Sequence, residues 1–175
     1  MYTQEISGRV DALVSRFGER DPYALQRAMR LLLLETPMGS FPTACKGFFM
    51  TQSRMRVIAV NTDLPEEMQR VVLAHEIGHA VLHYDRQNRS SFREFSMFDD
   101  ISKMEREANF FAAELLIPDE DVFAIVGADA SFFGAAGALS VPPQLLDFKL
   151  RAMKSRGYKQ ANTPLMSDSR FLRNV

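Results

Sequence analysis

An H-E-x-x-H pattern lies inside a segment of helical periodicity, and it limits both the local fold and the chemistry of this chain. His75 and His79 lie four residues apart in a run where apolar residues recur every three or four positions. Residues four apart share one face of an α-helix, so both imidazoles can point at a single metal ion. Glu76 is rotated by about 100° from His75, which places its carboxylate beside the pair. Two neutral nitrogen ligands with an adjacent carboxylate base are the components of a zinc hydrolase site.

The start of this helix is predicted at Asp63. Asp63 and Glu66 match a capping box, and Pro65 is tolerated in a first turn. Gly78 stands in mid-helix, where it costs about 1 kcal/mol relative to alanine. We expect it to permit close approach of another backbone or of a substrate, with a tolerated core glycine as the alternative. The apolar positions that share a face with the two histidines are Leu64, Met68, Val71, Val72 and Leu82.

A catalytic zinc site needs a third protein ligand and one open position. His83 lies four residues beyond His79. Three histidines at four-residue steps drift by about 80° on a straight helix, which makes joint coordination awkward. The sequence therefore leaves three roles for His83. It could support the ligands, line the cleft or form the solvated end of the helix.

The segment 103–116 offers two glutamates as third ligand. Glu105 lies on a predicted face of small residues, which would let this helix pack closely on the H-E-x-x-H helix. Glu105 is thus the preferred ligand and Glu107 the alternative. Ser102 and Glu105 also match a capping box, which would engage Glu105 at a helix start. A helix that begins at Asp100 or earlier leaves Glu105 available.

The remaining periodicity predicts an α+β fold that is mainly helical. Two short segments rich in β-branched and aromatic residues, 47–50 and 55–61, form an antiparallel hairpin, and a third short strand could lie near 43–46. Asp21 and Ser140 are expected to cap helices. The further helices are predicted over residues 4–16, 22–35, 100–117, 118–126, 131–139 and 141–156, with a loop over 85–100.

Composition excludes several classes of protein. The 175 residues are 46% hydrophobic, which suits one domain with a real core. Lysine plus arginine is 21 and aspartate plus glutamate is 22, so the chain lacks the basic excess of a dedicated nucleic-acid binder. The single Cys45 rules out an intramolecular disulfide and fits a reducing compartment. With no signal pattern and no membrane-length apolar run, we expect a cytoplasmic protein.

Residues 45–117 resemble the ImmA/IrrE family of metallo-endopeptidases. The order and spacing of the two helical motifs agree with the family, whereas 1–44 and 119–175 share only general helical character. The segments that carry the resemblance are Gly47-Phe48-Phe49, residues 57–61, residues 69–83 with the H-E-x-x-H pattern, and residues 105–118.

The resemblance implies a Zn²⁺ ion bound by His75, His79 and Glu105, with Glu76 as the general base on a zinc-bound water. We expect a zincin-like single domain over 1–160, with the small antiparallel sheet packed beside the H-E-x-x-H helix. Residues 161–175 are expected to form a loosely ordered tail. The resemblance further implies a cytoplasmic protease of phages or mobile elements, of anti-repressor type, that cleaves a helix-turn-helix repressor. No separate repressor domain is recognisable here, so that target is expected in trans.

Two other classes of function stay open. The last predicted helix carries Lys149, Arg151, Lys154 and Arg156, and with its neighbours it could form a helix-turn-helix DNA reader. Such a run of charge is more often a solvated helix face. A metal-stabilised module could instead inactivate a repressor by binding alone, although the intact Glu76 argues against this. Tyr84 and His83 are candidates for an oxyanion stabiliser only because they lie near the H-E-x-x-H pattern in the sequence.

Overall fold

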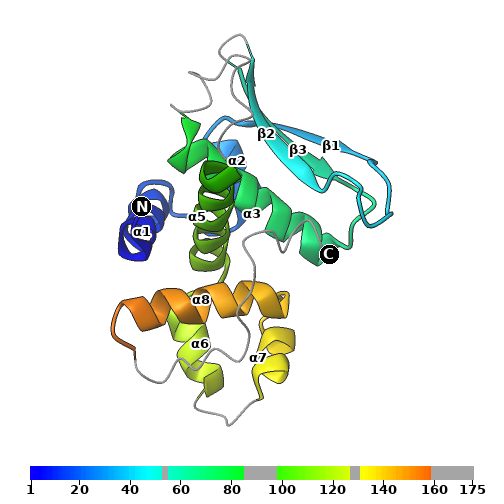
Figure 1. The fold of residues 1–175 in the computed structure, drawn as a ribbon. Helices are drawn as coiled ribbons and strands as arrows, with labels where there is room; N and C mark the ends of the chain where they lie inside the picture. The colour runs from blue at the N-terminus through cyan, green and yellow to red at the C-terminus, as the bar shows by residue number, and fades with distance from the viewer. Residues whose placement is uncertain (53–54, 85–97, 127–130, 159–175) are drawn as a thin grey trace.

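The computed structural model describes residues 1–52, 55–84, 98–126 and 131–158 (Figure 1). Helices form most of the described chain and a small three-stranded sheet completes it, which confirms the α+β, mainly helical fold class. The elements are α1 (Thr3–Phe17), α2 (Pro22–Ala28), β1 (Leu32–Thr36), β2 (Gly47–Gln52), β3 (Met55–Asn61), α3 (Glu66–Leu82), α5 (Phe98–Leu116), α6 (Asp119–Val126), α7 (Phe132–Ala138) and α8 (Pro143–Ser155).

The two helices that carry the predicted site pack directly against each other. On α3, a Cβ built at Gly78 would lie 3.1 Å from the Cβ of Phe111 on α5. Phe111 and Ala108 are both fully buried at this contact layer. The close approach expected at Gly78 is therefore made by an aromatic side chain. Neither a backbone nor a substrate fills that space.

The sheet lies on the other side of α3, with strand order β1-β3-β2 (Figure 1). β2 and β3 are antiparallel, with Phe49 opposite Ile58, which confirms the predicted hairpin. β1 runs parallel to β3, with Leu34 opposite Ala59. The sequence predicts a purely antiparallel sheet, but the three-stranded sheet is mixed.

The strand β1 overturns two sequence predictions. The helix expected over 22–35 ends at Ala28, and the chain turns through Arg30, whose φ is 55°. The predicted strand near 43–46 is absent, since these residues form a turn followed by irregular chain that leads into β2. The leucine run 31–34 suits a helix and a strand equally well by local pattern. Pairing with β3, which is distant in sequence, decides in favour of the strand.

Of the helix caps predicted at Asp21 and Asp63, the structure contains only the one at Asp21. Asp21 caps α2, where its Oδ2 accepts a hydrogen bond from the backbone N–H of Ala24 at 2.8 Å. The capping box at Asp63 is wrong. Its Oδ2 accepts a hydrogen bond from the N–H of Gly39 at 2.6 Å, and α3 begins after Pro65 without a side-chain cap. A loop folded back onto Asp63 thus takes the carboxylate that local sequence assigns to the helix.

The three short helices predicted after residue 117 are present as α6, α7 and α8, and they form a layer at the lower end of α5 (Figure 1). The cap predicted at Ser140 is wrong, because Ser140 has a φ of 51° and the N-cap of α8 is Pro142. Ser140 adopts this positive φ in the tight turn between α7 and α8, three residues before α8 begins at Pro143. Most of the predicted loop over 85–100 and the predicted tail over 161–175 fall outside the described residues, and α5 already begins at Phe98.

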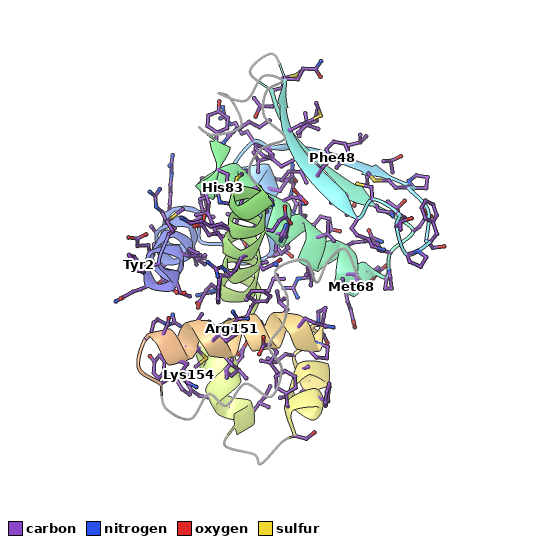
Figure 2. All side chains as sticks on the ribbon, in the orientation of Figure 1. Tyr2, Phe48, Met68, His83, Arg151 and Lys154 are labelled. Atoms are coloured by element: carbon purple, nitrogen blue, oxygen red, sulfur yellow. The ribbon has the colours of Figure 1, made fainter. Side chains whose placement is uncertain are left out.

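Much of the positive charge of α8 is neutralised inside the protein. Lys149 is 1% exposed, and its Nζ lies 2.9 Å from Glu114 and 2.6 Å from Asp119. Arg156 also pairs with Asp119, at 2.8 Å. Lys154 is exposed (Figure 2). The predicted run of basic residues is thus in large part an internal ion-pair cluster that joins α5, α6 and α8.

Candidate metal centre

The three side chains predicted as metal ligands lie together between α3 and α5. His75 and His79 occupy successive turns of α3, are both buried, and bring their Nε2 atoms within 3.1 Å of each other. Glu105 of α5 faces them, with Oε2 3.4 Å from Nε2 of His75 and Oε1 3.5 Å from Nε2 of His79. Within the described chain, this is the one group of three potential ligands that the structure brings together.

The spacing of these three groups fits a tetrahedral metal ion. Zinc binds histidine nitrogen and carboxylate oxygen at about 2.0–2.2 Å, so two ligand atoms of a tetrahedral site lie roughly 3.3 Å apart. The three distances measured here, 3.1, 3.4 and 3.5 Å, scatter around that value. Two imidazoles and one carboxylate are also a donor set typical of catalytic zinc. The residues present therefore fit the ion that the sequence predicts.

The electrostatics of the two histidines favour a cation at the same point. Burial lowers the pKa of His79 to about 3, and the positive charge of His75 adds to this effect, so His79 is neutral and can offer a lone pair. Burial alone would lower the pKa of His75, but a hydrogen bond to Glu105 and the charges of Glu76 and Glu105 raise it. The same carboxylates that favour a proton on His75 favour a metal ion there.

Glu76 is buried beside the three candidate ligands. Burial raises the pKa of its carboxyl to about 7, against a smaller lowering by the charge of His75. Glu105 adds to the increase, and a hydrogen bond with the backbone of Phe49 on β2 opposes it. A carboxyl group that titrates near neutrality can take up and return a proton at physiological pH.

The site opens into a pocket of about 620 Å³. Residues 43–49, from the loop before β2 and the start of that strand, form one wall, and α3 and α5 form the others. His75, Glu76, His79 and Glu105 all line it. The candidate metal ligands and the candidate base are thus reachable from the same cavity, which has the size of a typical ligand site.

Glu107, the alternative third ligand, points away from this pocket. Its Oε2 lies 2.9 Å from Nε2 of His83, and its Oε1 contacts the amino group of Met1. The helix α5 begins at Phe98, so Glu105 stands in mid-helix and the predicted capping role at Ser102 does not arise. The structure therefore groups Glu105, and not Glu107, with the two histidines.

His83 lies behind His79 and not in the pocket. It is 1% exposed, and its Nδ1 is 3.1 Å from Nδ1 of His79. Of the three readings left open, the solvated helix end and the cleft residue are wrong. Tyr84 lines a different cavity, next to Arg56, and is not brought to the candidate site.

Sequence reasoning missed two groups that contact the site. Asn109 is buried on α5, and a hydrogen bond with its side chain contributes to the raised pKa of His75. It stands four residues after Glu105, so helical spacing could have identified it. The backbone of Phe49 is the second group. A main-chain contact leaves no signal in residue type, so nothing in the sequence points to it.

Comparison with known proteins now decides the family. Residues 27–151 match the model of Peptidase_M78, the IrrE N-terminal-like domain. This chain belongs to the Peptidase_M78 family. The match confirms the resemblance seen over 45–117 and extends it from the end of α2 into α8. Membership in M78 implies a metalloprotease-like role for this protein.

One curated relative of this M78 protein comes from a virus. The "Uncharacterized immunity region protein 2" of Bacillus phage phi105 is 29% identical over 144 residues. The alignment covers 82% of this chain and 88% of the relative, so the similarity extends over most of both proteins. It supports the phage connection implied by the sequence. In the part of the M78 chain that the structure describes, no helix is long and apolar enough to cross a membrane.

Proposed function

We propose that this M78 protein is a zinc-dependent endopeptidase in which Glu76 is the general base. One observation carries the proposal. Ligand atoms of His75, His79 and Glu105 surround a single point at spacings suited to tetrahedral zinc, and Glu76 lines the same pocket. A site that only stabilised the fold would need no buried carboxyl group with a pKa near neutrality beside it.

The residues of the chain divide the chemistry between them. When bound, a zinc ion supplies Lewis acidity, which lowers the pKa of a water to about 7 and polarises a carbonyl oxygen. His75, His79 and Glu105 would hold the ion, and Glu76 would take a proton from the attacking water. Glu76 then returns that proton to the nitrogen of the broken peptide bond.

The substrate we propose is an extended segment of another protein. β2 is the outer strand of the sheet on the side of the pocket, and Gly47, Phe48 and Phe49 of this strand line the cavity. An extended peptide can bind at such an edge through main-chain hydrogen bonds, with side-chain pockets giving selectivity. The target we favour is a helix-turn-helix repressor cleaved in trans. The phage immunity-region relative supports that choice.

Nothing in the described residues favours the DNA-reading alternative. Lys149 and Arg156, two of the basic side chains that suggested it, pair with Glu114 and Asp119, and Lys149 is fully buried. Contacts to DNA phosphates need such groups exposed and unpaired. Peptide cleavage is therefore the better supported function.

Co-expression with a candidate helix-turn-helix repressor tests the proposal. Wild type should yield two repressor fragments by mass spectrometry, whereas Glu76→Gln should retain one zinc per chain and yield intact repressor. Equal cleavage by both would refute Glu76 as the base. Loss of repressor activity without cleavage by either would identify a binding module instead.

A further inference from the structure

Three buried side chains form a line that leads away from the metal centre. His79, His83 and Glu107 are joined by two short contacts, Nδ1 to Nδ1 at 3.1 Å and Nε2 to Oε2 at 2.9 Å. His83 is 1% exposed and Glu107 is 5% exposed, so solvent does not reach either contact freely. The opposite nitrogen of His79, Nε2, faces His75 and Glu105. The two ends of one imidazole therefore meet two different groups of residues.

The direction of each hydrogen bond in this line follows from its last member. An ionised carboxylate can only accept, so Nε2 of His83 must carry the hydrogen and donate it to Glu107. A neutral His83 then has a lone pair on Nδ1, which accepts the hydrogen of Nδ1 of His79. With its hydrogen on Nδ1, His79 presents a lone pair at Nε2, on the side of Glu105.

We propose that His83 and Glu107 are positioning residues that hold His79 in the tautomer and ring orientation required for metal binding. The inference rests on the proposed metal site and adds to it. A metal-bound histidine commonly donates its other N–H to a neighbouring acceptor, and loss of that acceptor weakens metal binding. Here the acceptor is a second histidine, itself oriented by a carboxylate from the partner helix.

The helix geometry explains why His83 serves in this way and not as a ligand. Positions 75, 79 and 83 follow at four-residue steps, and each step rotates the side chain by about 40° around the helix axis. The ring of His83 is therefore carried past the metal point and reaches the back of His79, at 5.2 Å between ring centroids. Glu107 meets it from α5, two residues after Glu105. The same pair of helices thus supplies both the ligands and their support.

A matched pair of substitutions at His83 isolates the acceptor. His83→Asn places an amide oxygen close to the former position of Nδ1, where it can still accept from His79. His83→Leu has the same branching and nearly the same shape but offers no acceptor. Both variants lose the contact with Glu107, so a difference in zinc affinity between them reports only the acceptor for His79.

Zinc dissociation constants from chelator competition provide the readout. We expect His83→Leu to bind zinc 10- to 100-fold more weakly than wild type, the range typical for loss of such a partner, and His83→Asn to recover most of that loss. Val122→Ala, a buried position on α6, should lower the midpoint of thermal unfolding and leave zinc affinity unchanged. Equal affinity in His83→Leu and wild type, or equal loss in both His83 variants, would overturn the inference.

Nitrogen-15 spectra of the imidazoles in zinc-loaded wild type give a second answer that needs no variant. They should show hydrogen on Nδ1 of His79 and on Nε2 of His83, and the opposite tautomer of either ring would overturn the inference. A wild-type protein that bound no zinc would instead refute the proposed function itself. Zinc binding that is insensitive to His83 would refute only the positioning role.

Discussion

Phe111 of α5 packs directly over Gly78 of α3, so that a Cβ at residue 78 would stand 3.1 Å from both Cβ and Cδ1 of the ring-bearing side chain. This contact sets the distance between the two helices next to His79 and about one turn from His75. Glu105 comes from α5, so its approach to the histidines depends on that distance. The separation of the helices and the geometry of the metal centre are therefore coupled.

Substitution of Gly78 by a large residue should change both the separation of α3 and α5 and the geometry of the candidate metal centre. Gly78→Leu is expected to lower the free energy of unfolding by roughly 1–3 kcal/mol through overpacking, and to weaken zinc binding because α5 is displaced. Urea unfolding and chelator competition measure the two effects. Gly8→Ala on α1 is the control, since nothing lies within 4 Å of the added Cβ. Gly8→Ala should stabilise the protein by up to about 1 kcal/mol. A Gly78→Leu variant with the stability and zinc affinity of wild type would contradict the coupling.

The pH dependence of stability should reveal the burial of Glu76. Its pKa is raised from 4.5 to about 7 in the folded protein, so the proton is bound more tightly there than in the unfolded chain. The associated stability is present below pH 4.5 and is lost as the pH rises through 7. We therefore compare the free energies of unfolding of Glu76→Gln and wild type in metal-free protein. Between pH 5 and pH 8, the difference should change in favour of Glu76→Gln by up to roughly 3 kcal/mol. A pH-independent difference in denaturant midpoint would argue against a buried, neutral Glu76.

Gly47 at the start of β2 should tolerate no side chain. A Cβ there would stand 2.5 Å from Cγ1 of Val72 and 2.8 Å from the backbone oxygen of Ala59. Gly47→Ala is expected to cost roughly 1–3 kcal/mol and to reduce peptide cleavage, since β2 would shift relative to Glu76. Adding Val72→Ala should restore only part of the stability, because the backbone clash remains. Thermal unfolding and peptidase assays of both variants check this, and full rescue by the double variant would be inconsistent with the geometry.

The ion-pair cluster below the site should matter for stability and not for metal binding. Lys149→Met leaves Glu114 and Asp119 with only Arg156 as a cationic partner among the described residues, and should destabilise the fold by roughly 3 kcal/mol. Lys154→Met, on the exposed face of the same helix, should have little effect. Zinc affinity should be unchanged in both. An unaltered denaturation midpoint for Lys149→Met would show that the cluster adds nothing to stability.

The central helix and the face that carries the candidate metal ligands could be predicted because their signals are local. His75, His79 and Glu76 are related by the helical repeat alone. Glu105 could be preferred over Glu107 from the face it shares with small residues, and the structure groups it with the histidines. In both cases the deciding periodicity lies within a few turns of one helix.

What sequence could not supply depends on contacts between distant segments. The leucines of β1 form a strand because β3 is available to pair with them. Asp63 leaves its helix because Gly39 offers a backbone N–H. The role of His83 is visible only once Glu107 of α5 is placed behind it. Each of these outcomes is decided by a partner at least 20 positions away, which local pattern does not encode.

Anomalous diffraction at the zinc absorption edge, on crystals of zinc-loaded protein, would locate the metal ion directly. We expect one peak per chain, within bonding distance of Nε2 of His75, Nε2 of His79 and the carboxylate of Glu105, with Glu76 beside it and unbound. A peak coordinated by Glu107, or no peak between α3 and α5, would contradict this expectation.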